Sequence, residues 1–266
     1  MSHAVPAAEP VILVQRAGTV VTVVLNRPDR MNAMNKAMWL ELGRAMRDVS
    51  ADDTVRCVVL RGAGGKAFSP GADITEFDSE RATPEQAAEY GELMGTTTEA
   101  IGDCPHPTVA LIEGNCVGAG LAIALTCDLR ICGEGSRFGV PVNRLGVSMP
   151  WSELATVVAA VGRSTALEIL FEARVFGAAE AKEKGIVSRV VADAEVEKEA
   201  YAMARRIADG APFVNRVHKR LVRTLARGEA LGDVDKALSF ACFATSDYRE
   251  GLAAFLGKRK PVFQGK

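Results

Sequence analysis

The chain has 266 residues, a length that suits one large domain or two small ones. Apolar residues make up 48% of it and charged residues 24%, which is typical of a globular protein. The formal net charge of −1 argues against the broad basic surface of a nucleic-acid-binding protein. The six cysteines form no C-x-x-C pair and the three histidines have no partner at ligand spacing, so we expect reduced, mostly buried thiols and no metal site.

The first ten residues, MSHAVPAAEP, are rich in alanine and proline and are predicted to be a disordered N-terminus. They lack the basic start and the long apolar core of a signal peptide. No apolar stretch is seen to reach the ~20 residues that a membrane-spanning helix needs. We therefore expect a cytoplasmic protein without a membrane partner.

The first predicted elements are two β-rich runs, at residues 11–15 and 19–26, which are separated by a glycine and indicate a hairpin. Asn35 is suited to cap a helix that runs to about residue 49, with apolar residues on one face. The continuous apolar run over residues 56–62 predicts a strand that is buried on both faces.

Strand, glycine-rich loop and helix then recur in series. The loop GAGGKAFSPGADI, residues 62–74, is followed by Thr83-Pro84-Glu85-Gln86, a capping-box start for a helix that runs to about residue 102. A strand at 108–114, a loop and helix over 115–128, and strands at 129–133 and 137–140 follow. This order implies a mostly parallel α/β arrangement.

From Trp151 onward the chain is predicted to be mainly helical, apart from one short strand at 187–191. Gly185 stands where the glycine that ends a helix belongs. The helical segments are 151–160, 163–172, 178–184, 194–210, 213–227, 230–246 and 248–256.

Five segments, taken in order, resemble the crotonase (enoyl-CoA hydratase/isomerase) superfamily. They are LNRPDRMNAMN (25–35), KAFSPGADITEF (66–77), GNCVGAGLAIALTCDLRI (114–131), VFGAAEAKEKGIVSRVV (175–191) and FATSDYREGLAAFLGKRKPVF (243–263). The resemblance covers roughly residues 11–266. It implies an acyl-CoA-binding core of spiralling ββα turns over residues 11–200, and a C-terminal helical region over 201–266 that assembles homo-trimers, often paired into hexamers.

The resemblance also implies that the ligand is an acyl-CoA whose thioester oxygen is held by the main-chain N–H groups of Ala72 and Ala119. Small residues suit this role because they let the backbone approach a ligand closely. Ala119 begins a predicted helix, where N–H groups lack intrahelical partners and the dipole favours negative charge. Taken alone, Gly118-Ala119-Gly120 would fit a tight turn that packs a helix on a strand. The spacing of these glycines differs from the dinucleotide-binding fingerprint.

Binding of the coenzyme A part is implied for three further groups of residues. Arg30, Met31 and Ala33 would lie near the adenine and pyrophosphate. The run Pro70, Gly71, Ala72, Asp73, Ile74 and Thr75 would follow the adenine and pantetheine. Phe255 and Lys258 would come from a neighbouring subunit, although the basic tail would also suit a solvated terminus. Many relatives carry lysine at the position of Thr75. No cofactor beyond coenzyme A is expected.

The catalytic carboxylates of the hydratases are missing. Motif matching places the first glutamate at Ala122 and the second at Val142, and an isomerase alternative at Pro150; none of these residues can carry a proton. With Trp151, the first two are expected to line an acyl pocket, although a core role suits the tryptophan as well. The predicted function is an enzyme that stabilises a thioester enolate and hydrates poorly, and the alternative is a non-catalytic acyl-CoA-binding protein.

Other polar residues near these positions could act on a ligand or stabilise the fold. Glu153 is the nearest downstream acid, and its alternative role is a favourable interaction with a helix N-terminus. Asn143 and Arg144 would orient a thioester or carboxylate, or else face solvent or a subunit contact. Asp73 and Asp128 are expected to brace nearby loop amides.

Overall fold

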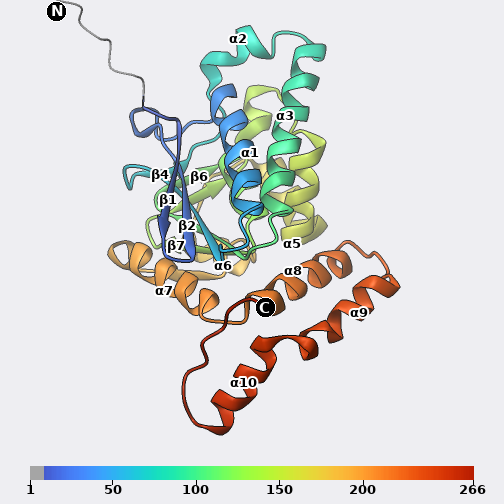
Figure 1. Ribbon diagram of the computed structural model, residues 1–266. Coiled ribbons are helices and arrows are strands. Elements are labelled where there is room, and N and C mark those ends of the chain that lie inside the picture. The colour runs from blue at the N-terminus through green and yellow to red at the C-terminus, as the bar shows by residue number, and fades with distance from the viewer. Residues whose placement is uncertain (1–8) are drawn as a thin grey trace, which may run out of the picture.

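The computed structural model describes residues 9–266, so most of the N-terminus predicted to be disordered lies outside the described residues. The larger of two sheets crosses the core with a hairpin at one edge (Figure 1). Its first two strands are antiparallel and all its other neighbours are parallel. In spatial order the strands are β1 (Ile12–Ala17), β2 (Val20–Leu25), β3 (Cys57–Gly62), β5 (Thr108–Ile112), β7 (Leu129–Gly133) and β10 (Arg189–Val191).

Four short strands form a second sheet, and they alternate along the sequence with strands of the first sheet. Its order is β4 (Ala67–Ser69), β6 (Asn115–Val117), β8 (Arg137–Gly139) and β9 (Phe176–Gly177), with only the last strand antiparallel. The strands follow one another in pairs, one from each sheet, and helices come after each pair. The pairs are β3 and β4, β5 and β6, and β7 and β8. This is the predicted spiral of ββα turns. The sequence analysis missed β4, β6 and β9, which are two or three residues long and lie within segments that it assigned to glycine-rich loops or left without an element.

Helices cover both faces of the larger sheet. On one side, α1 (Lys36–Ser50), α3 (Pro84–Gly102), α4 (Ala119–Thr126) and α5 (Trp151–Glu172) share the main core. On the other side, α7 (Val196–Ala208) packs on the opposite residues of the strands. Within β3, Val58 and Leu60 face the first core while Cys57 and Val59 face the second. The prediction that this strand is buried on both faces is confirmed.

The predicted helix signals act as expected. The Asn35 side chain accepts a hydrogen bond from the N–H of Met38, and Thr83 and Gln86 form the capping box at the start of α3. There are also two short helices, α2 (Phe77–Glu80), which buries no residue, and α6 (Ala178–Glu183), which buries Ala178 and Ala181. Gly185 follows α6 with a φ of +74°, the left-handed conformation that ends a helix.

Helix α5 joins the two predicted segments 151–160 and 163–172, and Gly162, with a φ of +74°, interrupts its helical backbone. By length and composition alone this helix could cross a membrane, which corrects the expectation that no stretch is long enough. Helices that pack inside proteins pass the same test. Here α5 packs against α3 and α4.

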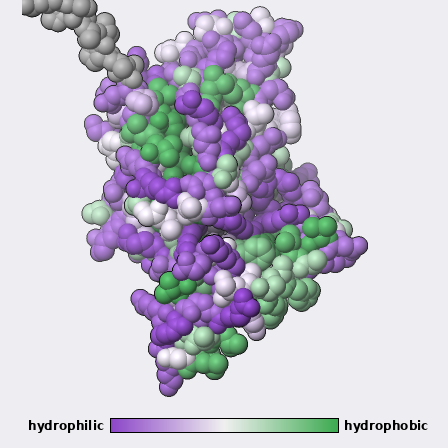
Figure 2. All heavy atoms as spheres, in the orientation of Figure 1, coloured by the Kyte–Doolittle hydropathy of each residue, from purple (hydrophilic) through white to green (hydrophobic). Residues whose placement is uncertain are grey.

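The C-terminal helices stand away from the core as a separate layer (Figure 1). They are α8 (Pro212–Ala226), α9 (Asp233–Ala241) and α10 (Ser246–Leu256). A predicted helix over 230–246 was too long, because Thr245 caps a new helix. Polar contacts tie α8 to the core, such as Lys219 Nζ at 2.7 Å from Asp128 Oδ2. Figure 2 shows hydrophobic residues gathered over this layer, and the exposed ones include Val222, Leu225, Val234, Phe240, Phe243, Phe255 and Leu256.

Candidate active site

A cleft of about 450 Å³ opens between the loop after β4, the start of α4, the turn after β8 and the start of α5. Its volume lies within the roughly 300–1,000 Å³ that is typical of ligand pockets. Segments far apart in the sequence line it together. The predicted residues among its lining are Pro70, Gly71, Ala72, Ile74, Ala119, Val142 and Trp151.

The two loops that carry Ala72 and Ala119 touch each other. Gly71 has a φ of +112°, and a Cβ atom placed on it would lie 3.5 Å from the main-chain nitrogen of Ala119. Gly118, at φ +56° and ψ −125°, turns the chain from β6 into α4. A side chain at either glycine would strain the turn or separate the loops. The glycine pattern thus brings residues 72 and 119 to one wall of the cleft.

The main-chain N–H groups of Ala72 and Ala119 have no hydrogen-bond acceptor within residues 9–266, whereas those of Gly71, Asp73 and Gly118 do. The N–H of Asp73 donates to the carbonyl of Met34 at 2.8 Å, and that of Gly118 donates to the carbonyl of Gly139 at 2.9 Å. Ala119 is the first residue of α4, where the helix itself supplies no acceptor. Two backbone donors are therefore available beside the cleft.

Asn32 fixes the loop that supports this wall. Its side chain is buried, and its Nδ2 donates to the carbonyls of Ala63 and Ala67 at 3.0 and 2.8 Å. Its Oδ1 accepts from the N–H of Arg27 at 3.1 Å. The φ of +65° suits asparagine better than most residues. The sequence analysis quoted this segment but missed the role of Asn32, since its partners Ala63 and Ala67 lie more than 30 residues further along the chain.

Asp73 and Thr75 brace the same loop and do not line the cleft. The Thr75 hydroxyl donates to Asp73 Oδ1 at 2.7 Å, and Arg27 Nη1 lies 3.0 Å from Asp73 Oδ2. The hydrogen bond from Thr75, and then the one from Arg27, lower the pKa of the Asp73 carboxyl despite its burial. Asp128 likewise accepts from the N–H of Thr108 at 2.7 Å. Both aspartates act as braces, as the sequence suggested.

The other residues expected to bind coenzyme A lie outside the cleft lining. Arg30 and Met31 are exposed and Ala33 is half-buried, all in the loop that Asn32 and Arg27 fasten. Phe255, at 81% exposure, is the second-last residue of α10, and Lys258 follows that helix. Their contacts with a ligand remain a prediction.

Of the three positions where motif matching predicts the carboxylates of relatives, Val142 and Pro150 line the cleft and Ala122 does not. Ala122 is fully buried in the main core, because every residue of α4 before Thr126 packs inward. Ala122 therefore does not line the cleft in this structure, and its contact with an acyl group stays a prediction. Trp151 borders the cleft with 71% of its surface exposed, so it is not a core residue.

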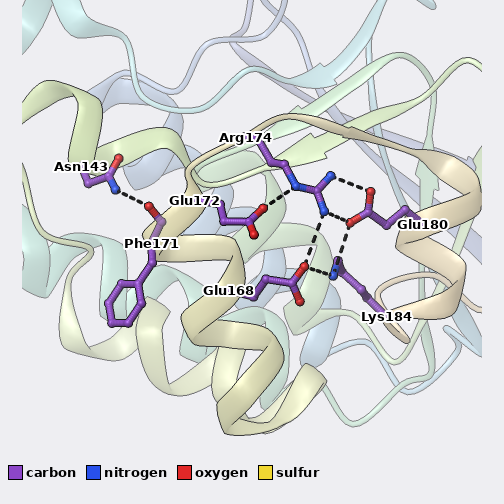
Figure 3. Close-up of polar contacts among 7 residues, drawn as sticks. All are labelled: Asn143, Glu168, Phe171, Glu172, Arg174, Glu180 and Lys184. Atoms are coloured by element: carbon purple, nitrogen blue, oxygen red, sulfur yellow. Dashed lines mark hydrogen bonds and ion pairs between the residues drawn. The ribbon is translucent and has the colours of Figure 1, made fainter.

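Asn143 anchors the turn that carries Val142. Its Nδ2 donates to the carbonyls of Leu170 and Phe171 at 3.0 and 3.1 Å, at the C-terminal end of α5 (Figure 3). These carbonyls lack partners within the helix, so the contact both caps α5 and holds the turn. Asn143 is thus a structural anchor of this turn, although its side chain is exposed.

A network of ion pairs fixes the chain just beyond this anchor (Figure 3). Arg174 pairs with Glu168, Glu172 and Glu180, and Lys184 Nζ lies 2.7 Å from Glu168 Oε1. Because several charges share partners, such a network holds its geometry better than an isolated pair. It ties the end of α5 to α6.

Three ionisable side chains line the cleft: Arg81, Glu92 and Glu153. Glu92 is exposed, whereas Glu153 is only 3% exposed and its Oε1 has no hydrogen-bond partner. Burial raises the pKa of the Glu153 carboxyl to about 7, although nearby Arg81 acts in the opposite direction. A role at the N-terminus of α5 does not account for this residue, because its buried oxygen accepts no hydrogen bond there.

Arg81 is held at the cleft by aromatic rings. Its guanidinium carbon lies 3.7 Å from the ring centre of Tyr90 and 4.8 Å from that of Phe77. It forms no ion pair with any residue of the described part of the chain, and its Nε has no hydrogen-bond partner. The sequence analysis missed Arg81, because it lies in a polar stretch that shows no pattern.

A spiral of ββα turns with two available backbone donors beside an apolar cleft defines a crotonase-type site. The sequence profile of the family described as enoyl-CoA hydratase/isomerase matches residues 15–266. The chain belongs to this family, within the crotonase superfamily.

Individual relatives agree with this assignment. The chain is 35% identical over 258 residues to a "Probable enoyl-CoA hydratase" of Rhizobium meliloti (strain 1021), with 95% of this chain and 97% of that protein covered. It is 32% identical over 261 residues to a "Crotonyl-CoA hydratase" of Syntrophomonas wolfei, with 96% and 98% covered. A crystal structure of an "enoyl-CoA hydratase/ carnithine racemase" from Magnetospirillum magneticum is similar at 46% identity and a TM-score of 0.94, with 96% of each chain covered.

The burial of Glu153 predicts a pH-dependent stability. A carboxyl whose pKa rises from 4.5 to about 7 on folding destabilises the native state as pH increases through this window. Glu153→Gln removes this penalty, so its free energy of unfolding should exceed that of the wild type by up to about 3 kcal/mol at pH 8 and by little at pH 4.5. Urea unfolding at fixed protein concentration measures both. Glu99→Gln, an exposed change on α3, is the control; an advantage that stays constant with pH would contradict the prediction.

Loss of the Asn32 side chain should loosen the loop behind the donors. Asn32→Ala removes three hydrogen bonds and leaves buried carbonyls without a donor, so we expect a loss of about 3 kcal/mol in the free energy of unfolding. Asn26→Ala, which removes one exposed hydrogen bond, is the matched control and should lose under about 1 kcal/mol. Equal losses for the two variants would show that Asn32 has no special role.

Proposed function

We propose that this protein is an acyl-CoA enzyme that holds a thioester oxygen between the N–H groups of Ala72 and Ala119 and stabilises an enolate there. The observation that carries the proposal is the pair of unpartnered donors on one cleft wall. Such donors stabilise charge that develops on oxygen, and each is typically worth about 10²–10³ in rate. Membership of a family whose relatives are named hydratases supports an acyl-CoA substrate.

The two-glutamate hydration of an enoyl-CoA is not the reaction we propose to be efficient. Ala122, Val142 and Pro150 cannot exchange protons with water or carbon. The donors survive this loss, because they belong to the backbone. Polarisation of the thioester is thus retained while the usual proton carriers are absent.

We further propose that the active form is a homo-trimer or hexamer in which Phe255 and Lys258 reach the coenzyme A of a neighbouring subunit. The apolar side chains exposed on α8, α9 and α10 support an interface there (Figure 2). Arg30, Met31 and Ala33 would contact the adenine end, since their loop is fastened to the loop of Ala72.

The second candidate is a non-catalytic acyl-CoA-binding protein, which the apolar residues at the carboxylate positions favour. The double variant Ala122→Glu/Val142→Glu separates the candidates when products from crotonyl-CoA are followed by mass spectrometry. Hydration that appears only in the double variant, with an inactive wild type, would indicate a binding protein. Its cleft would still bind the acyl-CoA but would lack the carboxylates that hydration needs. Circular dichroism serves as the check on folding, because position 122 is buried.

The donor of Ala119 can be removed by one substitution. Ala119→Pro deletes the N–H at the first position of α4, where proline is tolerated. We expect turnover of an acyl-CoA, or exchange of its α-protons, to fall about 10²–10³-fold. Ala119→Gly keeps the N–H and is the control, expected within a few-fold of the wild type. Unchanged activity in the folded proline variant would refute the assignment of this donor.

A further inference from the structure

We propose that Glu153 is the proton carrier of this site, which takes a proton from the α-carbon of the bound acyl group and returns it. The inference rests on the proposed function, since it needs a thioester held at Ala72 and Ala119. It assigns the missing acid–base role to a position on the first turn of α5, eleven residues beyond Val142.

Glu153 is the one side chain of the cleft lining that combines burial with the ability to exchange a proton. Among the cleft-lining residues, only Arg81, Glu92 and Glu153 ionise. The guanidinium of Arg81 does not release a proton in proteins, and the carboxylate of Glu92 is exposed to water. Ser148 adds a hydroxyl, which is too weak an acid or base without a partner. One buried carboxyl is left on the cleft surface.

The burial of Glu153 without a partner points to a role in ligand chemistry. A buried carboxyl oxygen normally accepts a hydrogen bond, and leaving one unsatisfied destabilises the fold. Here Oε1 of Glu153 has none, and no charged residue of the described chain forms an ion pair with it. A carboxyl that titrates near neutral pH instead of forming a structural contact suits proton transfer.

The proposed step balances without any further reactant. The C–H bond at the α-carbon breaks and its proton passes to the Glu153 carboxylate. The electron pair of that bond forms the carbon–carbon double bond of the enolate, and the thioester C=O electrons move to the oxygen held by the N–H groups of Ala72 and Ala119. Reversal returns a proton from Glu153 to carbon.

Few charges surround Glu153, so its ionisation should govern the pH profile. Arg81, which follows α2, is the cation whose field reaches it. Helix α3 contributes Glu92 at the cleft, and neither α4 nor the turn with Val142 adds an ionisable group to the lining. The base is the carboxylate form, so proton abstraction should rise tenfold per pH unit below the pKa and level off above it.

Exchange of acyl α-protons with deuterated water tests the inference. Wild type, Glu153→Gln, Glu153→Asp and the exposed control Glu99→Gln are incubated with butyryl-CoA, and deuterium uptake is measured by mass spectrometry against a sample without enzyme. Calorimetry with butyryl-CoA is run on each protein. We expect Glu153→Gln to bind within about threefold of the wild type and to exchange at least 10²-fold more slowly. Glu153→Asp should keep part of the rate and the pH-dependent rise, and Glu99→Gln should match the wild type.

The outcomes separate this inference from the proposed function. Glu153→Gln that exchanges as fast as the wild type, or a wild type that binds butyryl-CoA without exchange at any pH between 5 and 9, would overturn Glu153 as the proton carrier while leaving thioester binding intact. A folded wild type that binds no acyl-CoA would refute the proposed function, and this inference with it. A loss of exchange that tracks a loss of binding would assign Glu153 a structural role instead.

Discussion

The site depends on a close approach between two loops, one after β4 and one before α4. Gly71 and Gly118 adopt backbone conformations that other residues avoid, and so the chain passes close enough for a Cβ on Gly71 to contact the nitrogen of Ala119. This approach leaves two N–H groups without protein acceptors at the edge of the cleft. Backbone donors have fixed positions, so the protein does not need to reorganise when charge develops on a bound oxygen.

Other parts of the fold hold this arrangement in place. The spiral stacks β4, β6 and β8, so that consecutive turns supply the loops around one cleft. Asn32 and Arg27 cross-link the loop before α1 to the one before Ala72, and Asn143 fastens the opposite wall to α5. These contacts are made by side chains that the chemistry itself does not use, and they explain why the wall is stable although its central donors are unpaired.

The cleft also combines a largely apolar lining with one buried acid that has no partner among the described residues. Val142 and Pro150, where motif matching predicts the carboxylates of relatives, line the cleft, and Glu153 lies on the next helix. Retaining a buried, unpartnered carboxyl opposes stability, because its ionised form is poorly solvated. Such a cost agrees with the proposed role of Glu153 as the proton carrier.

The sequence by itself determined the hairpin, the capped starts of α1 and α3, the two-sided burial of β3 and the family, because these depend on local periodicity, caps and ordered motifs. The short strands β4, β6 and β9 were missed, since two or three residues show no clear period. Only the tertiary structure decided that Ala122 is buried, that Asn143 caps α5 and that Glu153 faces the cleft without a partner. Burial and hydrogen-bond partners come from segments far apart in the chain, and no local pattern encodes them.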